Sequence, residues 1–333
     1  MSGIQEKPLV TISMAAYNQE RFIRDSVRGV LAQTYEPLEI VISDDHSTDR
    51  TWEIINEEVA AYKASGGIHK NIVLNRNERN LGIALHSNVI SALEHGVLRV
   101  ANAGDDISFP NRVERIVEEW VKDGSRASFI HNGGRKIDER GNDLGPLPEY
   151  GITYSLGAAT TYLAAPSGFF GPIEFKGAYE DCVYATRAMM IGTELIVPDE
   201  LMYYRVGVGL SSVKGVRHRL RAANIKGAHA NLLACKQNML DLDRIHGRIS
   251  EAKWGAVKSF VEQRMAREKA RIDLYEGESF LKRWYGYRHI GMDRMRISTF
   301  LVRTIFLLPP ILADPIFDFL EWVKIRLRGR SCD

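Results

Sequence analysis

The first 131 residues alternate between short apolar runs and longer runs with apolar residues at helical spacing. This alternation restricts the fold more than any other feature of the chain. Strand-like runs are expected at 9–14, 38–43, 71–74, 97–102 and 127–131, with helix-like runs at 19–32, 51–64, 83–95 and 110–123. Repeated strand–helix units of this kind favour a mostly parallel sheet with helices on both faces. The sequence therefore predicts an α/β fold.

Paired carboxylates follow two of the strand-like runs. Asp44 and Asp45 end the run at 38–43, and Asp105 and Asp106 follow the run at 97–102. In open α/β sheets, ligands bind just outside the carboxyl ends of the strands. Folding alone explains such pairs poorly, because adjacent like charges repel. We therefore expect both pairs to serve a site for a nucleotide, a sugar or a metal ion.

Several short motifs occur in a characteristic order along the chain. They are Val10-Thr-Ile-Ser-Met-Ala-Ala-Tyr-Asn18, Gln33-Thr34, Glu39-Ile-Val-Ile-Ser-Asp-Asp-His-Ser-Thr-Asp49, Asn80-Leu-Gly82, Gly104-Asp-Asp-Ile-Ser-Phe-Pro110, Glu180-Asp181 and Tyr203-Tyr-Arg205. Each motif is weak alone, but the ordered set is specific. Over residues 8–212 the chain resembles the family 2 glycosyltransferases of GT-A fold.

The resemblance implies an enzyme that inverts the anomeric centre while it transfers a sugar. The donor would be a nucleotide-diphosphate sugar, and the acceptor a hydroxyl of a glycan or lipid-linked molecule, as in bacterial O-antigen or capsule synthesis. A divalent cation, Mg²⁺ or Mn²⁺, would neutralise the diphosphate leaving group. Both ions prefer oxygen ligands, commonly one or two carboxylates together with phosphates and water.

The resemblance also assigns the donor site residue by residue. Asp45 matches the residue that accepts a hydrogen bond from the base, which favours uracil or guanine over adenine. Asp105 and Asp106 match the metal-binding turn, although Ala103 stands where the family usually has the first Asp of Asp-x-Asp-Asp. One contact to ribose or metal is therefore missing. The donor-binding residues implied are Ala15, Tyr17, Asp44, Asp45, Gly104, Asp105 and Arg205.

A third acidic pair, Glu180 and Asp181, is implied on the acceptor side. Asp181 matches the family's general base, and Glu180 is expected to orient the site or the acceptor. The same pair would also be favoured at a helix N-terminus by the helix dipole alone. Arg205 is expected either to face the diphosphate or to form a structural ion pair, and the sequence leaves both roles open.

The chain divides by composition into three parts. Residues 1–215 are interpreted as the catalytic domain, with a nucleotide-sugar half at 8–131 and an acceptor half at 132–215. Residues 132–175 are rich in Gly and Pro, and we expect irregular loops there with a hairpin turn at 140–142, followed by a helix at 180–191 and a short strand at 194–197. Residues 216–280 form a helical appendage, which we expect to break near Gly247.

The remaining segment, residues 281–333, is basic and amphipathic. It carries 10 Lys/Arg against 5 Asp/Glu, although the whole chain has a net charge of only +2. Apolar residues at 316, 319, 320, 323 and 327 share one helical face, a pattern typical of a helix lying in a membrane interface. We expect binding to an anionic membrane surface; packing against protein or a dimer partner is the alternative.

The remaining features bear on location and on rival functions. Residues 1–8 lack an apolar core like that of a signal peptide, and no uncharged run approaches the ~20 residues of a membrane span. Three widely spaced Cys residues favour a reducing compartment. The expected location is cytoplasmic, on the inner face of the membrane, with no nucleic-acid partner.

Rival functions are a catalytically weak nucleotide-sugar-binding protein and a sugar nucleotidyltransferase. A dinucleotide oxidoreductase is disfavoured because no Gly-x-Gly-x-x-Gly follows a strand.

Overall fold

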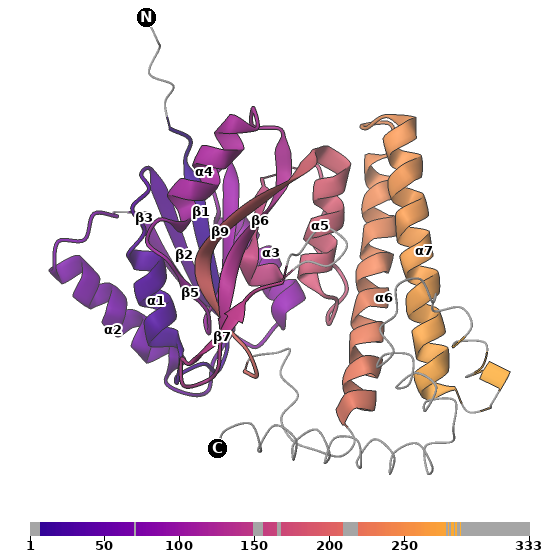
Figure 1. Cartoon of the computed structure of the whole chain (residues 1–333), viewed down its shortest axis with the longest axis horizontal. Helices are drawn as coiled ribbons and strands as arrows, with labels where there is room; N and C mark the ends of the chain where they lie inside the picture. Colours follow the sequence, from indigo (N-terminus) through magenta and orange to yellow (C-terminus); the bar gives the residue numbers. More distant parts are fainter. Residues whose placement is uncertain are drawn as a thin grey trace, which may run out of the picture. The chain divides into compact units, whose positions relative to one another are not determined.

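The computed structural model describes residues 7–69, 71–148, 156–164, 168–208 and 219–277, together with 279, 281, 282, 284 and 287 (Figure 1). The amphipathic helix expected at 316–327 therefore lies outside the described residues. By internal contacts the chain forms two units, one of residues 1–212 and 237–257 and the other of residues 213–236 and 258–333. The predicted GT-A site residues all belong to the first unit.

A parallel half-sheet is built from the four strands that the sequence predicts first. These are β1 (Val10–Ala16), β2 (Leu38–Asp44), β3 (Asn71–Arg76) and β4 (Leu98–Ala103), in the order β3-β2-β1-β4. All neighbouring pairs run parallel. Because parallel strands end at the same edge, the residues that follow β1, β2 and β4 are brought together there.

The sequence predicted the rest of the sheet only in part. It continues β8-β6-β9-β5, with β7 paired to β6, and its elements are β5 (Ile107–Ser108), β6 (Ala127–Ile137), β7 (Asp143–Pro146), β8 (Thr160–Leu163) and β9 (Thr193–Arg205). The run expected at 127–131 begins β6 and the run expected at 194–197 lies within β9, whereas β5, β7 and β8 were not predicted. The hairpin turn at 140–142 is confirmed, since β6 and β7 pair antiparallel. The segment at 156–163 is more regular than expected, with a 3-10 turn η1 (Gly157–Ala159) leading into β8.

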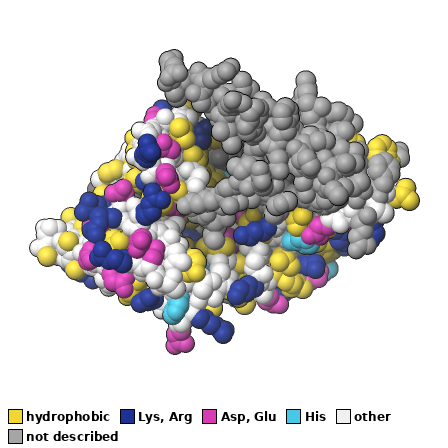
Figure 2. All heavy atoms as spheres, turned by 90° about the horizontal axis from the view of Figure 1, so that it is seen from below, with side chains coloured by type: hydrophobic (Ala, Val, Ile, Leu, Met, Phe, Trp, Pro, Cys, Tyr) yellow, Lys and Arg dark blue, Asp and Glu magenta, His cyan; other side chains and the backbone are white. Residues whose placement is uncertain are grey.

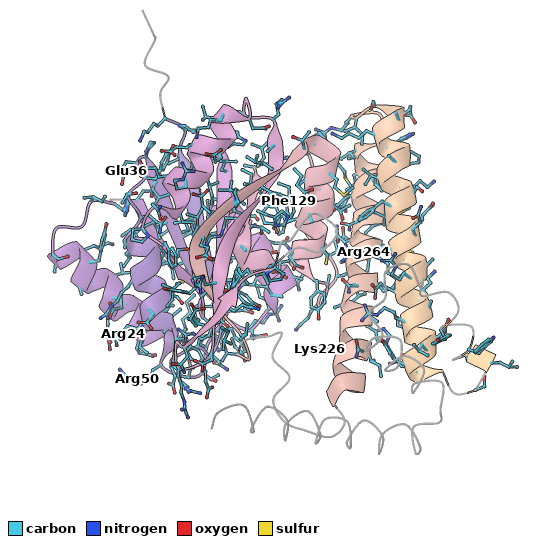
Figure 3. All side chains as sticks on the ribbon, in the orientation of Figure 1. Arg24, Glu36, Arg50, Phe129, Lys226 and Arg264 are labelled. Atoms are coloured by element: carbon cyan, nitrogen blue, oxygen red, sulfur yellow. The ribbon has the colours of Figure 1, made fainter. Side chains whose placement is uncertain are left out.

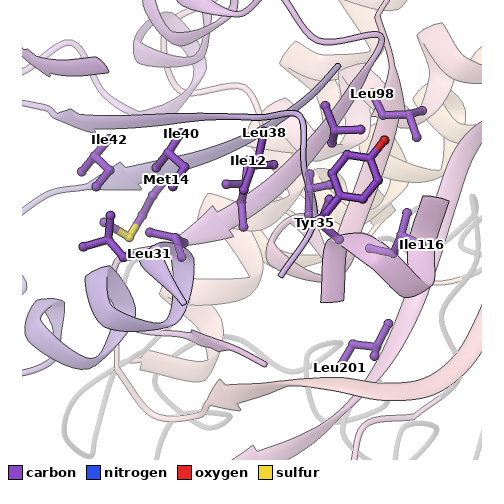
Figure 4. Close-up of a cluster of buried hydrophobic side chains, with 14 of the residues drawn as sticks. Ile12, Met14, Leu31, Tyr35, Leu38, Ile40, Ile42, Leu98, Ile116 and Leu201 are labelled. Atoms are coloured by element: carbon purple, nitrogen blue, oxygen red, sulfur yellow. The ribbon is translucent and has the colours of Figure 1, made fainter. Parts of the chain in front are cut away.

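Helices cover both faces of the sheet, as predicted. The helices α1 (Ile23–Leu31), α2 (Thr51–Ala64) and α4 (Arg112–Lys122) pack on one face, and α3 (Ile83–Leu93) and α5 (Glu180–Ile191) lie on the other. In the first layer, Ile12 and Ile40 of the sheet pack with Leu31 and Ile116 (Figure 4). On the opposite face, Phe129 of β6 lies between the sheet and α5 (Figure 3).

The exposed side of α1 and α2 is held by ion pairs. Acidic and basic side chains lie next to one another on the left of Figure 2, where these two helices are. Arg28 of α1 contacts Glu58 of α2 at 2.7 Å, and Arg24 contacts Glu57 at 2.8 Å. The Arg24–Glu57 pair is exposed on both sides, and pairs of that kind contribute little stability, whereas the Glu58 carboxylate that binds Arg28 is buried.

Two long helices follow the mixed α/β part. They are α6 (Arg219–Ile245) and α7 (Glu251–Glu276), and the break between them includes Gly247, as predicted. The end of α6 is integrated into the first unit, because buried Arg187 of α5 forms an ion pair with buried Asp241 at 2.7 Å. Within the described residues, none of the helices has the length and apolar character required to cross a membrane.

Candidate active site

The ends of β1, β2 and β4 form the edge at which the predicted donor residues meet. Ala15 is in register with Ser43 of β2 and Ala103 of β4, and Ala16 is in register with Asp44. The backbone N–H of Gly104 donates to the Ala15 carbonyl at 3.0 Å. Parallel pairing therefore places Ala15, Asp44 and Gly104 side by side.

The loop after β1 is hydrogen-bonded to the loop after β2, and one aromatic ring of this loop is exposed to solvent. Asn18 has a positive φ of 50°, its N–H donates to Ser47 Oγ at 2.9 Å, and its side chain accepts from the Thr48 N–H at 2.8 Å. Tyr17, just before it, is 37% exposed. The ring of Tyr17 is thus available to a ligand at this edge, as expected for a residue that contacts a base.

The first acidic pair is buried and already hydrogen-bonded within the protein. Asp44 Oδ2 accepts a hydrogen bond from the Ser47 N–H at 2.9 Å and lies 3.5 Å from Arg76 Nε. Asp45 accepts from the side chain of Asn77 at 2.8 Å. It also accepts the backbone N–H groups of Leu81 at 2.9 Å and Gly82 at 2.8 Å. With about four lone-pair sites on a carboxylate, Asp45 retains capacity for one further donor.

Asp45 thereby fixes the start of α3. Gly82 is the N-cap residue of this helix and has a positive φ of 79°, a conformation that glycine adopts without steric cost. On the same helix, His86 is buried and its Nε2 lies 2.7 Å from Ser43 Oγ. Burial lowers the pKa of His86, while the charges of Asp45 and Asp44 oppose that shift. A neutral imidazole therefore supports this edge of the sheet.

The second acidic pair, at the turn after β4, contains two carboxylates in different surroundings. Asp106 is 1% exposed, and its Oδ1 accepts the backbone N–H of Arg205 at 2.8 Å. Burial, followed by the charge of Asp105, holds the pKa of Asp106 well above its usual range. Asp105 is 7% exposed, and burial raises its pKa as well. In the described part of the chain, no other side chain hydrogen-bonds to the Asp105 carboxylate.

Arg205 closes this turn from the end of β9. Its Nε donates to the Asp105 carbonyl at 3.1 Å, and its Nη1 donates to the Asp138 carbonyl at 3.0 Å. The guanidinium also lies 4.8 Å from the centre of the Phe22 ring. The sequence left two roles open for Arg205, and its contacts within the described residues are structural. Three of its five N–H groups are not used by these contacts.

Arg112 joins the surroundings of this turn to η1, and the sequence did not predict this role. It is fully buried, and burial lowers its pKa to about 10. Its five N–H donors are matched by five contacts, to Asn132 Oδ1, Asn102 Oδ1, Ser108 Oγ and the carbonyls of Ala101 and Ala158, at 2.7–3.3 Å. A charged residue directly after Pro110-Asn111 would ordinarily be placed on a helix surface, so no local signal marked it.

Glu180 and Asp181 open α5 beside η1. A Cβ placed on Gly157 would lie 3.6 Å from Glu180 Oε1 and 3.5 Å from Asp181 Cβ. Because Arg112 binds the next carbonyl in η1, one buried side chain links the Asp105–Asp106 turn to the segment that contacts Glu180 and Asp181. Burial, followed by the charge of Asp181, raises the pKa of Glu180 to about 8.

The oxygen ligands at the Asp105 turn suit a hard divalent cation that is held mainly by the phosphates of a bound substrate. Within the described residues, no group of three or more His, Cys, Asp or Glu side chains could hold a metal ion. Mg²⁺ is often held by one or two carboxylates together with substrate phosphates and water. Asp105 provides one such carboxylate, while Ala103, as expected, provides none.

The comparisons with known proteins agree with this arrangement. Residues 11–163 match the model of glycosyl transferase family 2. EpsE of Bacillus subtilis, a glycosyltransferase by name, is 34% identical over 149 residues, which cover 44% of this chain and 51% of EpsE. Chondroitin synthase of Escherichia coli is 34% identical over 139 residues, or 42% of this chain and 19% of the synthase. The match thus spans about half of EpsE and about a fifth of the chondroitin synthase.

Solved structures show the same fold. TarS of S. aureus (residues 1–349, with UDP-GlcNAc) has a TM-score of 0.52 and 16% identity, covering 84% of this chain and 89% of TarS 1–349. The mannosyltransferase PcManGT of Pyrobaculum calidifontis, with GDP-Man and Mn²⁺, has a TM-score of 0.50 and 12% identity, covering 87% and 89%. At these identities the likeness establishes the GT-A fold alone.

Proposed function

Residues 11–163 belong to glycosyltransferase family 2, and we propose on this basis that the protein is an inverting glycosyltransferase. It moves a sugar from a nucleotide-diphosphate donor to a hydroxyl of a glycan or lipid-linked acceptor. The observation that carries the proposal is the common edge of β1, β2 and β4, where Ala15, Asp44 and Gly104 lie side by side. The acidic turn at Asp105 follows directly.

We assign the donor to this edge. Tyr17 offers an exposed aromatic face for the base, and the free capacity of Asp45 suits one ring N–H, as in uracil or guanine. The related folds solved with UDP-GlcNAc and with GDP-Man support these two bases. Arg205 retains N–H groups for the diphosphate. Asp44 accepts a hydrogen bond from the Ser47 N–H, so we assign it a structural role in the loop beside the donor.

A divalent cation, Mg²⁺ or Mn²⁺, fits the open carboxylate of Asp105. When bound, it would supply charge neutralisation of the diphosphate leaving group. PcManGT, solved with Mn²⁺, supports this choice of ion. Asp106, also expected as a ligand, has one oxygen engaged by Arg205. We therefore give Asp105 the principal role and Asp106 the role of shaping the turn.

Asp181 is the proposed general base. As the acceptor oxygen forms its bond to the anomeric carbon, the bond from that carbon to the diphosphate breaks with its electron pair, and the hydroxyl proton passes to Asp181. Glu180, whose pKa is raised to about 8 by burial and by Asp181, is largely protonated at neutral pH. In that form it can donate a hydrogen bond that orients the acceptor.

The proposed setting is polysaccharide synthesis at the inner face of a membrane. The chondroitin synthases of Escherichia coli and Pasteurella multocida and the hyaluronan synthase of Pasteurella multocida are among the sequence relatives. The basic segment at 281–333 would hold the protein against anionic lipid, near a lipid-linked acceptor. Residues beyond 287 lie outside the described part of the chain, so this part of the proposal is supported by the charge pattern of the sequence.

One alternative has a specific observation in its favour. Ala103 removes a family carboxylate, and the oxygens of Asp44 and Asp45 are largely engaged by the protein. A nucleotide-sugar-binding protein with weak catalysis would tolerate both features. It differs from the enzyme in one measurable respect, since it would bind donor without releasing nucleoside diphosphate.

A screen of nucleotide sugars with and without Mn²⁺ tests the function. We expect thermal stabilisation by a UDP- or GDP-sugar that depends on Mn²⁺, because a ligand at ~100 times its dissociation constant adds about 2.7 kcal/mol of stability. Release of nucleoside diphosphate in the presence of glycan acceptors then separates enzyme from binding protein. The absence of stabilisation by every nucleotide sugar would contradict the proposal.

A further inference from the structure

A cavity of about 540 Å³ lies on the α3–α5 face of the sheet, away from the edge assigned to the donor. Gly96 and Arg99 line it from the amino end of β4, and Leu163 of β8 is paired with Leu98 beside them. The donor residues follow the opposite end of the same strand. The cavity is therefore a second concave site in the first unit, and its volume lies in the range of about 300–1,000 Å³ typical of small-molecule pockets.

One face of α5 leads from the acidic pair into this cavity. Tyr184, Arg187, Ala188 and Ile191 all line it. They follow Glu180 at spacings of four, seven, eight and eleven residues, which places all five on one side of the helix. Glu180 is thus the N-terminal member of the helix face that forms a wall of the cavity.

The polar groups of the cavity are held in place and their charges are compensated. Arg99 forms an ion pair with Glu94 at 3.0 Å, donates to Ser91 Oγ at 2.9 Å and lies 4.8 Å from the Tyr184 ring centre. All four residues line the cavity. A site with paired charges has fixed hydrogen-bonding groups without a strong attraction for an ion.

A buried hydroxyl in the wall lacks a hydrogen bond of normal geometry among the described residues. Tyr162 lines the cavity and is 6% exposed, and its hydroxyl makes no such bond there, although the Thr160 side chain favours its ionised form. An unsatisfied buried hydroxyl costs about 1–3 kcal/mol. Burial, followed by the charges of Asp181 and Glu180, raises the pKa of Tyr162, so this residue is near the acidic pair as well as the cavity.

Aromatic rings supply the apolar surface. Phe170 and Tyr184 both line the cavity, and the guanidinium of Arg187 lies 5.1 Å and 5.8 Å from their ring centres. Arg187 is fixed by its ion pair with Asp241 and by donation to the Gly171 carbonyl at 2.8 Å. The rings are therefore presented by a rigid wall.

We propose that this cavity binds a neutral sugar unit of the acceptor, next to the unit whose hydroxyl reacts at Glu180 and Asp181. A pyranose has hydroxyl edges that match Arg99, Glu94, Ser91 and the orphan hydroxyl of Tyr162, and C–H faces that match the aromatic rings. A hydrocarbon would leave the Tyr162 hydroxyl unpaired, and an anion would meet charges already compensated. The inference rests on the proposed glycosyltransferase function, whose acceptor it specifies.

Ala164→Trp tests the site by filling it. Ala164 lines the cavity with an exposed side chain, and its backbone N–H, which donates to the Val97 carbonyl, is kept in the variant. The matched control is Ala64→Trp, which adds the same ring at an exposed position of α2. Saturation-transfer NMR on the full chain would use glucose, galactose, mannose, N-acetylglucosamine, lactose, cellobiose, maltose and chitobiose as probes.

We expect at least one of these sugars to bind the wild type and the control, with at least tenfold weaker binding to Ala164→Trp. If Ala164→Trp does not fold, Phe170→Ala, which removes one aromatic face, takes its place with the same expected loss. Unchanged binding in the folded cavity variant, or binding of none of the eight sugars to the wild type, would overturn the inference. Nucleotide-sugar binding, measured on the same samples, reports separately on the proposed function and is expected to be equal in all variants.

Discussion

The Asp106 carboxylate accepts the backbone N–H of Arg205 at 2.8 Å, which ties the turn after β4 to the end of β9. Within the described residues no other side chain hydrogen-bonds to its neighbour Asp105, whose carboxylate accepts only from its own backbone N–H. The two adjacent carboxylates thus differ: Asp106 is bonded to a distant strand, whereas Asp105 is the one we propose as the metal ligand.

Asp105→Ala should abolish the Mn²⁺-dependent part of nucleotide binding while the protein stays folded. Within the described residues the Asp105 carboxylate accepts only from its own backbone N–H and is otherwise influenced by the charge of Arg205, so its removal should weaken ligand binding more than the fold. Thermal shift with UDP or GDP, with and without Mn²⁺, measures the effect. Asp25→Ala on the exposed surface of α1 is the control and should behave as wild type. Metal-dependent stabilisation that survives in Asp105→Ala would refute the assignment.

Asp181→Asn should lower kcat by about 10²–10⁴, the usual contribution of a general base, with donor affinity nearly unchanged. The amide has almost the same shape but cannot take a proton at neutral pH. Glu180→Gln keeps a hydrogen-bond donor at its position and should be milder. Product formation and donor titration in one preparation provide both quantities. If Glu180→Gln is the inactive variant, the two roles are exchanged; activity in both places the base elsewhere.

Glu180 should make the protein less stable as the pH rises. Burial and Asp181 raise its folded pKa from 4.5 to about 8, while Arg99 opposes this. Between these values the folded state holds a proton that the unfolded state has released, so the free energy of unfolding falls with increasing pH. Below about pH 4.5 this loss of stability is absent, and above about pH 8 it is complete.

Glu180→Gln cannot ionise, so its melting temperature should exceed that of wild type by a margin that grows from pH 5 to pH 8. Thermal melts across this range provide the measurement. The exposed Glu53→Gln on α2 is the control, and its melting curve should run parallel to wild type. A constant difference between Glu180→Gln and wild type at all pH values would show that Glu180 does not titrate as described.

Arg112→Lys should destabilise the fold although it keeps the charge. Arginine satisfies five acceptors here, whereas lysine has three donors, so at least two buried acceptors lose their partner. At ~1–3 kcal/mol for each, the loss should be about 2–6 kcal/mol. Urea denaturation measures it, with exposed Arg79→Lys as the control. A loss below ~0.5 kcal/mol, within the usual range for surface substitutions, would show that the network adapts.

Removal of the residues after Gly277 should abolish binding to anionic liposomes. The basic excess of residues 281–333 supplies the attraction, at about 1 kcal/mol for each Lys or Arg near the surface. Co-sedimentation of the full chain at low salt should weaken as salt is added, because surface charges are screened. If the full chain does not sediment with anionic liposomes, the segment has a packing or dimer role instead.

Local sequence patterns were sufficient for the parallel half of the fold. The helices at 51–64 and 180–191 were predicted with the bounds observed, because their apolar spacing and flanking residues agree. β8 was missed because its four residues are stabilised by pairing with β4 on one side and β6 on the other, at large separations in sequence. β9 was predicted too short, since it continues past Pro198 with shifts in register against β6.

The site was predictable in its residue types but not in its bonding. The sequence placed Asp45 at a strand end, yet nothing in it showed that Leu81 and Gly82 would direct their N–H groups at that carboxylate. Arg112 gave no signal, because burial of its guanidinium depends on acceptors from four different segments. The cavity beside Tyr162 likewise arises only when α3, α5 and β4 are assembled.

The ion pair between Arg187 and Asp241 determines how far this protein could be shortened. A truncation at residue 215 would leave the buried Arg187 without its partner carboxylate, and an uncompensated buried charge costs about 3–5 kcal/mol. Arg187 also lies against the rings of Phe170 and Tyr184, so the loss would affect the wall of the cavity first. A graft of residues 132–215 onto a related protein would therefore have to include residues 237–257.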